Sequence, residues 1–126
     1  MNRIIDANLN RFKEGIRVVE DILRYHFSSP LAKELKELRH IKIKNYDELI
    51  KNRDSINDIL KPSTKKELKR ESLKDILIAN FKRAQESARV LEEIYKLKDI
   101  QISNQFKEAR YKLYNLEKEA LKLCQT

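Results

Sequence analysis

The sequence has few of the residues that interrupt regular structure: its 126 residues include one glycine, two prolines and no tryptophan. The P-loop and the dinucleotide-binding fingerprint each require at least two glycines, so both kinds of phosphate-binding loop are excluded. Glycine and proline also dominate tight turns, and their scarcity disfavours a fold of many short strands. Leu, Lys, Glu, Ala and Arg favour helix and dominate the remainder, so the composition indicates a helical protein.

Cysteine and long apolar runs are also scarce. The single cysteine, Cys124, cannot form an internal disulfide, and no Cys/His spacing of a metal site surrounds it. No apolar segment approaches the roughly 18 residues of a membrane span. The N-terminal residues MNRIIDANLN lack the plan of a signal peptide. These absences favour a cytoplasmic location and argue against a membrane partner.

Charged residues are abundant, at 38% of the chain, with a formal net charge of +8. Lys and Glu alternate along most segments, as solvated helix faces do. The basic surplus suits an anionic partner such as a phosphorylated small molecule. The densest basic cluster, within residues 65–70, has no DNA-reading motif and few neighbouring aromatics, so we expect no nucleic-acid partner.

Apolar residues recur at helical spacing in four long segments. The pattern predicts helices over about 2–26, 30–53, from either 64 or 72 to 98, and 104–123. Thr64 with Glu67, and Ser72 with Asp75, resemble capping boxes at the two alternative starts of the third helix. Residues 53–64 have no helical period and form the one long connection.

The two halves of the chain share a pattern. ANLNRFKEGIRVVED (7–21) aligns with ANFKRAQESARVLEE (79–93) at an offset of 72, and Arg39 aligns with Arg110 at an offset of 71. We therefore predict an all-α fold: a four-helix bundle of two duplicated αα-hairpins related by a pseudo-two-fold axis. It forms a single domain over 1–126, with repeat 1 at 3–52, the connection at 53–64 and repeat 2 at 65–124.

Polar residues interrupt the apolar sector of the repeated helix. On a helical wheel, the apolar sector runs from Val18 through Ile4 and Val19 to Phe12. Six polar residues fall inside this sector or at its edge and should point toward the bundle interior: Asn8, Arg11 and Glu14 in repeat 1, and Asn80, Arg83 and Glu86 in repeat 2. A buried arginine without a partner is very costly. Two readings stay open. In the first, Arg11 pairs with Glu86 and Arg83 with Glu14, and these pairs fix the register of the bundle without binding a ligand. In the second, the arginines face an anion in a polar cavity.

Further basic and acidic groups extend this pattern. Arg17 and Arg89 continue the polar stripe, and Arg39 and Arg110 recur on the second helix of each hairpin. Arginine suits phosphate because its planar fork donates two hydrogen bonds. In the connection, Arg53-Asp54-Ser55 is followed by Asp58. Two carboxylates at this spacing can share a magnesium ion, although capping or loop solubility explains them equally.

The pattern DANLNRxxEGxRVxED, followed by LKxLRH, RDS, ANxKRxQExxRVLEE and RYxLYxLE, resembles one family over nearly the whole chain. It is the small helical hydroxymethylpyrimidine phosphate kinase, often fused to the N-terminus of thiamine-phosphate synthase, and this chain would be its stand-alone form. The resemblance implies phosphoryl transfer from ATP to 4-amino-5-hydroxymethyl-2-methylpyrimidine monophosphate, giving the diphosphate used in thiamine biosynthesis. It also implies ATP and Mg²⁺ as cofactors.

With this resemblance, each candidate residue receives an expected role. The expected catalytic residues are Arg11, Arg83, Glu14 and Glu86; the expected substrate-binding residues are Asn8, Asn80, Arg17, Arg89, Arg39, Arg110 and Arg53; the expected metal ligands are Asp54 and Asp58. A homodimer and a functional association with thiamine-phosphate synthase stay open. The alternative functions are a non-catalytic helical dimerisation or interaction module with Arg–Glu networks, and a mutase acting on a dicarboxylate.

Overall fold

The computed structural model describes residues 1–125, apart from the side chain of Lys66; Thr126, the end of the predicted domain, lies outside the described residues. The helices are α1 (Asn2–Asp21), a π-helical continuation η1 (Ile22–His26), α2 (Leu31–Arg39), α3 (Tyr46–Ile50), α4 (Lys65–Leu68), α5 (Leu73–Tyr95) and α6 (Ile100–Lys122). Over residues 1–125 there is no β-strand, so the all-α prediction is confirmed. None of the described helices is both long and apolar enough to cross a membrane.

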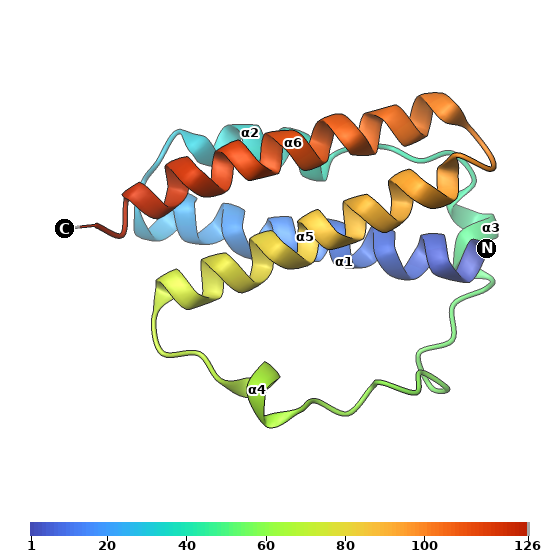
Figure 1. Cartoon of the computed structure of the whole chain (residues 1–126), viewed down its shortest axis with the longest axis horizontal. Helices are drawn as coiled ribbons and strands as arrows, with labels where there is room; N and C mark the ends of the chain where they lie inside the picture. Colours follow the sequence, from blue (N-terminus) through green and yellow to red (C-terminus); the bar gives the residue numbers. More distant parts are fainter. Residues whose placement is uncertain (126) are drawn as a thin grey trace.

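Four of these elements form the bundle. The antiparallel helices α1 and α5 run through its middle, with α2 packed on α1 and α6 packed on α5. Figure 1 shows α2 and α6 on one side of the α1–α5 pair, and the long connection between α3 and α5 on the opposite side. The predicted helical bundle is therefore confirmed, whereas its origin by duplication stays a prediction.

The core lies where α1, α2, α5 and α6 meet. In α1 the buried apolar residues recur every three or four positions, which places them along one side of the helix: Ile5, Leu9, Phe12, Ile16 and Val19. Phe106 of α6 contacts Phe12 edge-to-face, with ring centroids 5.4 Å apart, and stacks on Tyr95 at 6.0 Å. These aromatic contacts tie the outer helix α6 to both central helices.

Local capping residues set several helix starts. The Ser72 hydroxyl accepts a hydrogen bond from the backbone N–H of Asp75 and begins α5, and the Thr64 hydroxyl accepts one from Glu67 and begins the short α4. Both predicted capping boxes therefore start separate helices. Asp99 caps α6 through the N–H groups of Gln101 and Ile102, so α6 begins earlier than predicted.

The predicted helix over 30–53 is wrong in its second half. α2 ends at Arg39, and only the short α3 follows before the connection. Ile41 and Ile43 are partly buried against the core, while Lys42 and Lys44 between them are exposed. This alternation has the period of an extended chain, which a helix cannot satisfy. Asn45 then takes a left-handed conformation with φ of 71° before α3 begins.

The glycine of the sequence lies at a close approach of the two central helices. A Cβ atom on Gly15 would lie 3.0 Å from the backbone oxygen of Asn80 and 3.4 Å from the backbone nitrogen of Ala84. Backbone atoms of a packed helix cannot move aside cheaply, so any larger side chain would force α1 and α5 apart.

Gly15→Leu should therefore lower the free energy of unfolding by about 2 kcal/mol or more through overpacking. The measurement is urea denaturation followed by circular dichroism. Lys118→Leu, at an exposed position of α6, is the matched control and should change stability by less than about 0.5 kcal/mol. Equal stability of the two variants would contradict the close approach of α1 and α5.

Candidate active site on the central helices

The structure corrects the predicted direction of the repeated charged residues. Arg11, Glu14, Arg83 and Glu86 are exposed, so the prediction that they point into the bundle interior is wrong. The error came from counting Val18 and Ile4 in the core sector of the wheel, although they are 38% and 43% exposed in the structure. The core side of α1 is centred instead on residues such as Phe12 and Ile16. The charged residues therefore lie on the outer face of the central helices, opposite the core.

These four side chains are also unpaired. Among the described residues, none of them has an ion pair within 4.0 Å, and the predicted Arg11–Glu86 and Arg83–Glu14 pairs are not formed. The reading in which they fix the register of the bundle therefore has no support in the structure. Their charges are free to meet a ligand.

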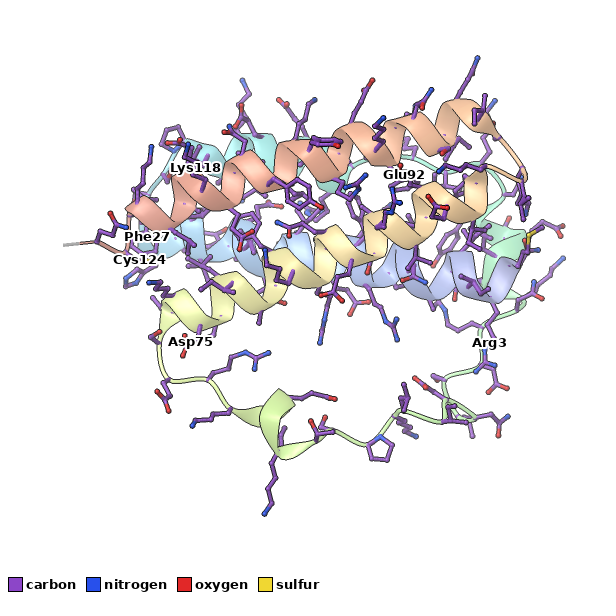
Figure 2. The ribbon with its side chains drawn as sticks, viewed as in Figure 1. Arg3, Phe27, Asp75, Glu92, Lys118 and Cys124 are labelled. Atoms are coloured by element: carbon purple, nitrogen blue, oxygen red, sulfur yellow. The ribbon has the colours of Figure 1, made fainter. Side chains whose placement is uncertain are left out.

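A different pair of arginines holds the helices together. Arg39 of α2 donates two hydrogen bonds to Glu20 of α1, at 2.6 and 3.2 Å, and Arg110 of α6 donates two to Glu92 of α5, at 3.1 and 2.9 Å. Both glutamates are buried. Figure 2 shows Glu92 where α5 faces α6. The structure therefore places Arg39 and Arg110 on buried carboxylates. Arg39 also lines a hollow with Glu14 and Arg17, and Arg110 shares Glu92 with Arg89.

Glu20 and Glu92 received no role from the sequence, although the offset of 72 relates them and the offset of 71 relates their arginines. That shared offset was the signal that could have identified the two pairs. The hydrogen bond to Glu20 and its negative charge raise the pKa of Arg39. The pKa of Arg110 is raised first by its hydrogen bond to the Tyr114 hydroxyl and then by the hydrogen bond and charge of Glu92, so both arginines stay charged at all working pH values.

The remaining repeated arginines lie on the flanks of the outer face. Arg17 pairs with Asp21 within α1, and Arg89 pairs with Glu92 and Glu93 within α5. Arg17 and Glu14 line a shallow hollow between α1 and α2. Arg89 and Glu86 line a corresponding hollow between α5 and α6. Both hollows lie to the side of the seam between α1 and α5.

One cleft gathers five of the predicted residues. It encloses about 450 Å³ between the N-terminal half of α1 and the segment after α3, and its lining includes Asn8, Arg11, Arg53, Asp54 and Asp58. Residues far apart in the sequence thus meet in one place, and both signs of charge are present. This cleft is the candidate active site.

Ion pairs and hydrogen bonds fix the wall of the cleft to α1. Arg53 donates two hydrogen bonds of 2.8 Å to the buried carboxylate of Asp6, and Arg3 donates one of 2.9 Å to the backbone oxygen of Asp54. Figure 2 shows Arg3 at the end of α1 beside this segment. Sequence reasoning missed Arg3 and Asp6, because their partners lie about 50 positions away in the chain.

The carboxylates of the cleft are suited to a cation. Hydrogen bonds from the side chain and the backbone of Asn57 lower the pKa of Asp54 below its usual range, and the charge of Arg3 adds to this effect. Asp54 is therefore ionised throughout the neutral range. Asp58 accepts a hydrogen bond from the backbone N–H of Leu60 through one oxygen.

The metal implied by the resemblance fits this donor set in a specific way. Mg²⁺ is commonly held by one or two carboxylates together with phosphates and water, which matches Asp54 and Asp58. Within residues 1–125, however, no group of three or more His, Cys, Asp or Glu residues could hold a metal ion. The chain can therefore supply part of a magnesium shell, with substrate phosphates and water completing it.

The two repeated asparagines have matching geometry. The side-chain Nδ2 of Asn8 donates to the backbone oxygen of Ile4 at 2.9 Å, and that of Asn80 donates to Ile76 at 2.9 Å. In each case Oδ1 has no hydrogen-bond partner among the described residues. Each asparagine is thus held by its own helix with an acceptor oxygen still available.

A larger hollow contains none of the predicted residues. About 820 Å³ lies between α2 and α6, where the lining mixes apolar side chains with glutamates and lysines. It offers no arginine and no polar group held in place by a hydrogen bond. Size alone would favour this hollow, but the charges needed to bind a phosphate lie at the cleft on α1.

Comparison with known proteins shows the family of this chain. The model of the ThiD2 family matches residues 3–119, which is most of the chain. The chain belongs to the ThiD2 family. Similar proteins include the thiamine-phosphate synthases of Nostoc punctiforme (41% identity), Synechocystis (41%) and Prochlorococcus marinus (38%), with 91%, 91% and 94% of this chain covered. The chain spans about a third of their length, 34–35%. No solved structure matches it significantly.

The buried pairs of this ThiD2 chain give a stability prediction. Arg39→Met leaves Glu20, whose side chain is 2% exposed, without its partner, and should cost about 3 kcal/mol of unfolding free energy. Arg17→Met removes a largely exposed pair and should cost less than about 0.5 kcal/mol. Urea denaturation of both variants checks this; a small loss in Arg39→Met would contradict a structural role for the pair.

Proposed function

We propose that this ThiD2 chain is an ATP-dependent phosphotransferase of thiamine biosynthesis. It transfers the γ-phosphoryl group of ATP to 4-amino-5-hydroxymethyl-2-methylpyrimidine monophosphate and yields the diphosphate. The observation that carries the proposal is the cleft on α1, where unpaired Arg11 lies with Asp54 and Asp58. Such a set of cationic and carboxylate groups is what phosphoryl transfer requires, because catalysis there is mainly positioning and charge stabilisation.

The proposed reaction needs no strong base. A phosphate oxygen of the acceptor attacks the γ-phosphorus, and the bond between that phosphorus and the β–γ bridging oxygen breaks, so ADP leaves with the electron pair. A phosphate monoester has its second pKa near 6, so the attacking oxygen is already ionised at neutral pH. The absence of a histidine from the lining of the cleft is therefore compatible with catalysis.

In this proposal, the cationic residues bind phosphate and the carboxylates bind the metal. Arg11 binds the transferring phosphoryl group and stabilises the negative charge on its oxygens. Asp54 and Asp58 hold Mg²⁺, which when bound neutralises the phosphates of the nucleotide. Arg53 is held by Asp6, and its principal role is to position the wall that carries the two aspartates. Asn8 offers an acceptor oxygen to the amino group of a bound base.

The names of the relatives support a role in thiamine biosynthesis, but they do not identify the phosphorylation step. They are named thiamine-phosphate synthases, and two thirds of each lies outside the region matched here. A kinase that supplies the pyrimidine diphosphate would be a natural neighbour of an enzyme that makes thiamine phosphate. We therefore also propose functional association with such a synthase.

The kinase proposal predicts release of ADP that depends on the acceptor, with the pyrimidine diphosphate detected by mass spectrometry. Arg11→Met should lower kcat/KM by about 100-fold or more, as expected for loss of a charged contact to the transferring group. Arg24→Met removes an exposed arginine away from the cleft and should leave the rate within twofold. Absence of turnover in the wild-type chain would contradict the kinase proposal and favour a non-catalytic interaction module.

The metal role gives a separate prediction. Asp58→Asn should raise the Mg²⁺ concentration needed for half-maximal rate by about tenfold, because one charged ligand is lost. Asp47→Asn, on exposed α3, is the matched control. The readout is the rate at fixed ATP as Mg²⁺ is titrated. An unchanged magnesium dependence in Asp58→Asn would remove Asp58 from the metal site.

A further inference from the structure

The outer face of the central helices has an unexpected pattern of identity. Five residues of α1 and five of α5 form a row of exposed or half-exposed side chains, which we call the outer stripe. Its members are Ile4, Ala7, Arg11, Glu14 and Val18 in α1, and Ile76, Ala79, Arg83, Glu86 and Val90 in α5. At the offset of 72, all five pairs are identical. Six buried apolar pairs at this offset all differ: Ile5/Leu77, Leu9/Phe81, Phe12/Ala84, Ile16/Ala88, Val19/Leu91 and Leu23/Tyr95. The buried polar pair Glu20/Glu92, which binds Arg39 and Arg110, is identical.

Packing cannot explain this pattern. Core residues are constrained by volume, and exposed residues usually tolerate substitution within about 0.5 kcal/mol. Here the six apolar core positions differ between the two helices, and the outer stripe is the same. The constraint on the outer stripe must therefore come from something that contacts both helices in the same way.

The contact at Gly15 sets Arg11 and Arg83 on neighbouring turns of α1 and α5. α1 and α5 are antiparallel (Figure 1), and they approach closely where Gly15 meets Asn80 and Ala84. Arg83 adjoins Ala84 in sequence, and Arg11 lies one turn before Gly15, about 6 Å along the helix axis. Arg11 and Arg83 thus flank the seam between the helices, and both are exposed and unpaired among the described residues.

Each arginine is accompanied by the same asparagine. Asn8 and Asn80 lie three positions before Arg11 and Arg83, and each is fixed by the same hydrogen bond to its own helix. Each half therefore presents an acceptor oxygen beside a guanidinium group. This pairing suits a molecule that carries both an amino group and a phosphate.

The proposed reaction has the same symmetry as this surface. During transfer, the migrating phosphoryl group lies between two phosphate oxygens, one from ADP and one from the acceptor. Both substrates also carry an aminopyrimidine ring, as part of adenine in ATP and as the free ring in the acceptor. The surface has one Asn–Arg unit on each side of the seam between α1 and α5. It therefore suits two ligands, each with an aminopyrimidine ring and a phosphate, whose phosphates meet at the seam.

Resting on the proposed function, we propose that the two central helices form one composite site in which each binds a different substrate. The Asn8–Arg11 unit binds MgATP, and the Asn80–Arg83 unit binds the phosphate of the pyrimidine acceptor. Arg83 is thereby a substrate-binding residue 72 positions from its counterpart. The phosphoryl group crosses the seam from the nucleotide on α1 to the acceptor on α5.

The assignment of substrates follows from the differences between the halves. The cleft beside Arg11 adds Arg3 and Arg53 and the carboxylates Asp54 and Asp58, which suits a polyphosphate with its metal. Asp6, which anchors that wall, corresponds to Ile78 in α5, so this anchor has no equivalent beside Arg83. The less charged unit suits the smaller monophosphate.

The test measures binding of each ligand separately by calorimetry on the full chain. The probes are a non-hydrolysable ATP analogue with Mg²⁺, and the pyrimidine monophosphate alone. Arg11→Met should lower the affinity for the nucleotide at least about tenfold and the affinity for the acceptor less than twofold, as expected for loss of one charged hydrogen bond. Arg83→Met should lower the affinity for the acceptor at least about tenfold and that for the nucleotide less than twofold. Arg24→Met should change neither, and thermal melts establish that all three variants are folded.

The outcomes separate this inference from the kinase proposal. The wild-type chain could catalyse the reaction while both variants lose affinity for the same ligand, or while Arg83→Met loses affinity for neither. Either result overturns the composite site and leaves the kinase proposal standing. An exchanged pattern, with Arg83→Met weakening the nucleotide, overturns the assignment. If the two ligands respond to different arginines but no diphosphate forms, the two binding units are supported and the kinase proposal fails.

Discussion

The close contact of α1 with α5 at Gly15 is the constraint on which the rest of the structure depends. Because Gly15 has no side chain, the backbone of α5 can approach α1 directly at Asn80 and Ala84. This contact brings together two segments separated by 72 positions and sets their charged residues on one outer face. It also leaves the opposite side of both helices for α2 and α6, where the core forms (Figure 1).

Arginine has two distinct roles in this protein, and burial of the partner separates them. Arg39 and Arg110 reach carboxylates buried between helices, where a lost partner is costly, and so they hold α2 and α6 in place. Arg11 and Arg83 are exposed and unpaired among the described residues, so they contribute little to the bundle and can bind an anion. A single reading for all the repeated arginines, structural or functional, would be incorrect.

The two halves are alike in their helices and different in what surrounds them. Both carry the same Asn–Arg unit and the same buried Glu–Arg pair, and these matches support the predicted duplication. Only beside Arg11 does the described part of the chain add a wall, fixed by Arg53 to Asp6, with two carboxylates. This combination of a shared unit and a distinct surrounding suits the proposed transfer between two different substrates.

The sequence by itself determined the helical class, the capping residues Ser72 and Thr64, and the pairing of the two halves, because composition, caps and repeats are local or linear signals. It also selected Asn8, Arg11, Arg53, Asp54 and Asp58, which share one cleft. Tertiary structure alone decided which side of α1 faces the core. Val18 and Phe12 are both apolar, and only packing against α5 and α6 shows that Phe12 is buried and Val18 is not. For the same reason, only the fold could show that Arg39 meets Glu20 while Arg11 has no ion-pair partner within residues 1–125.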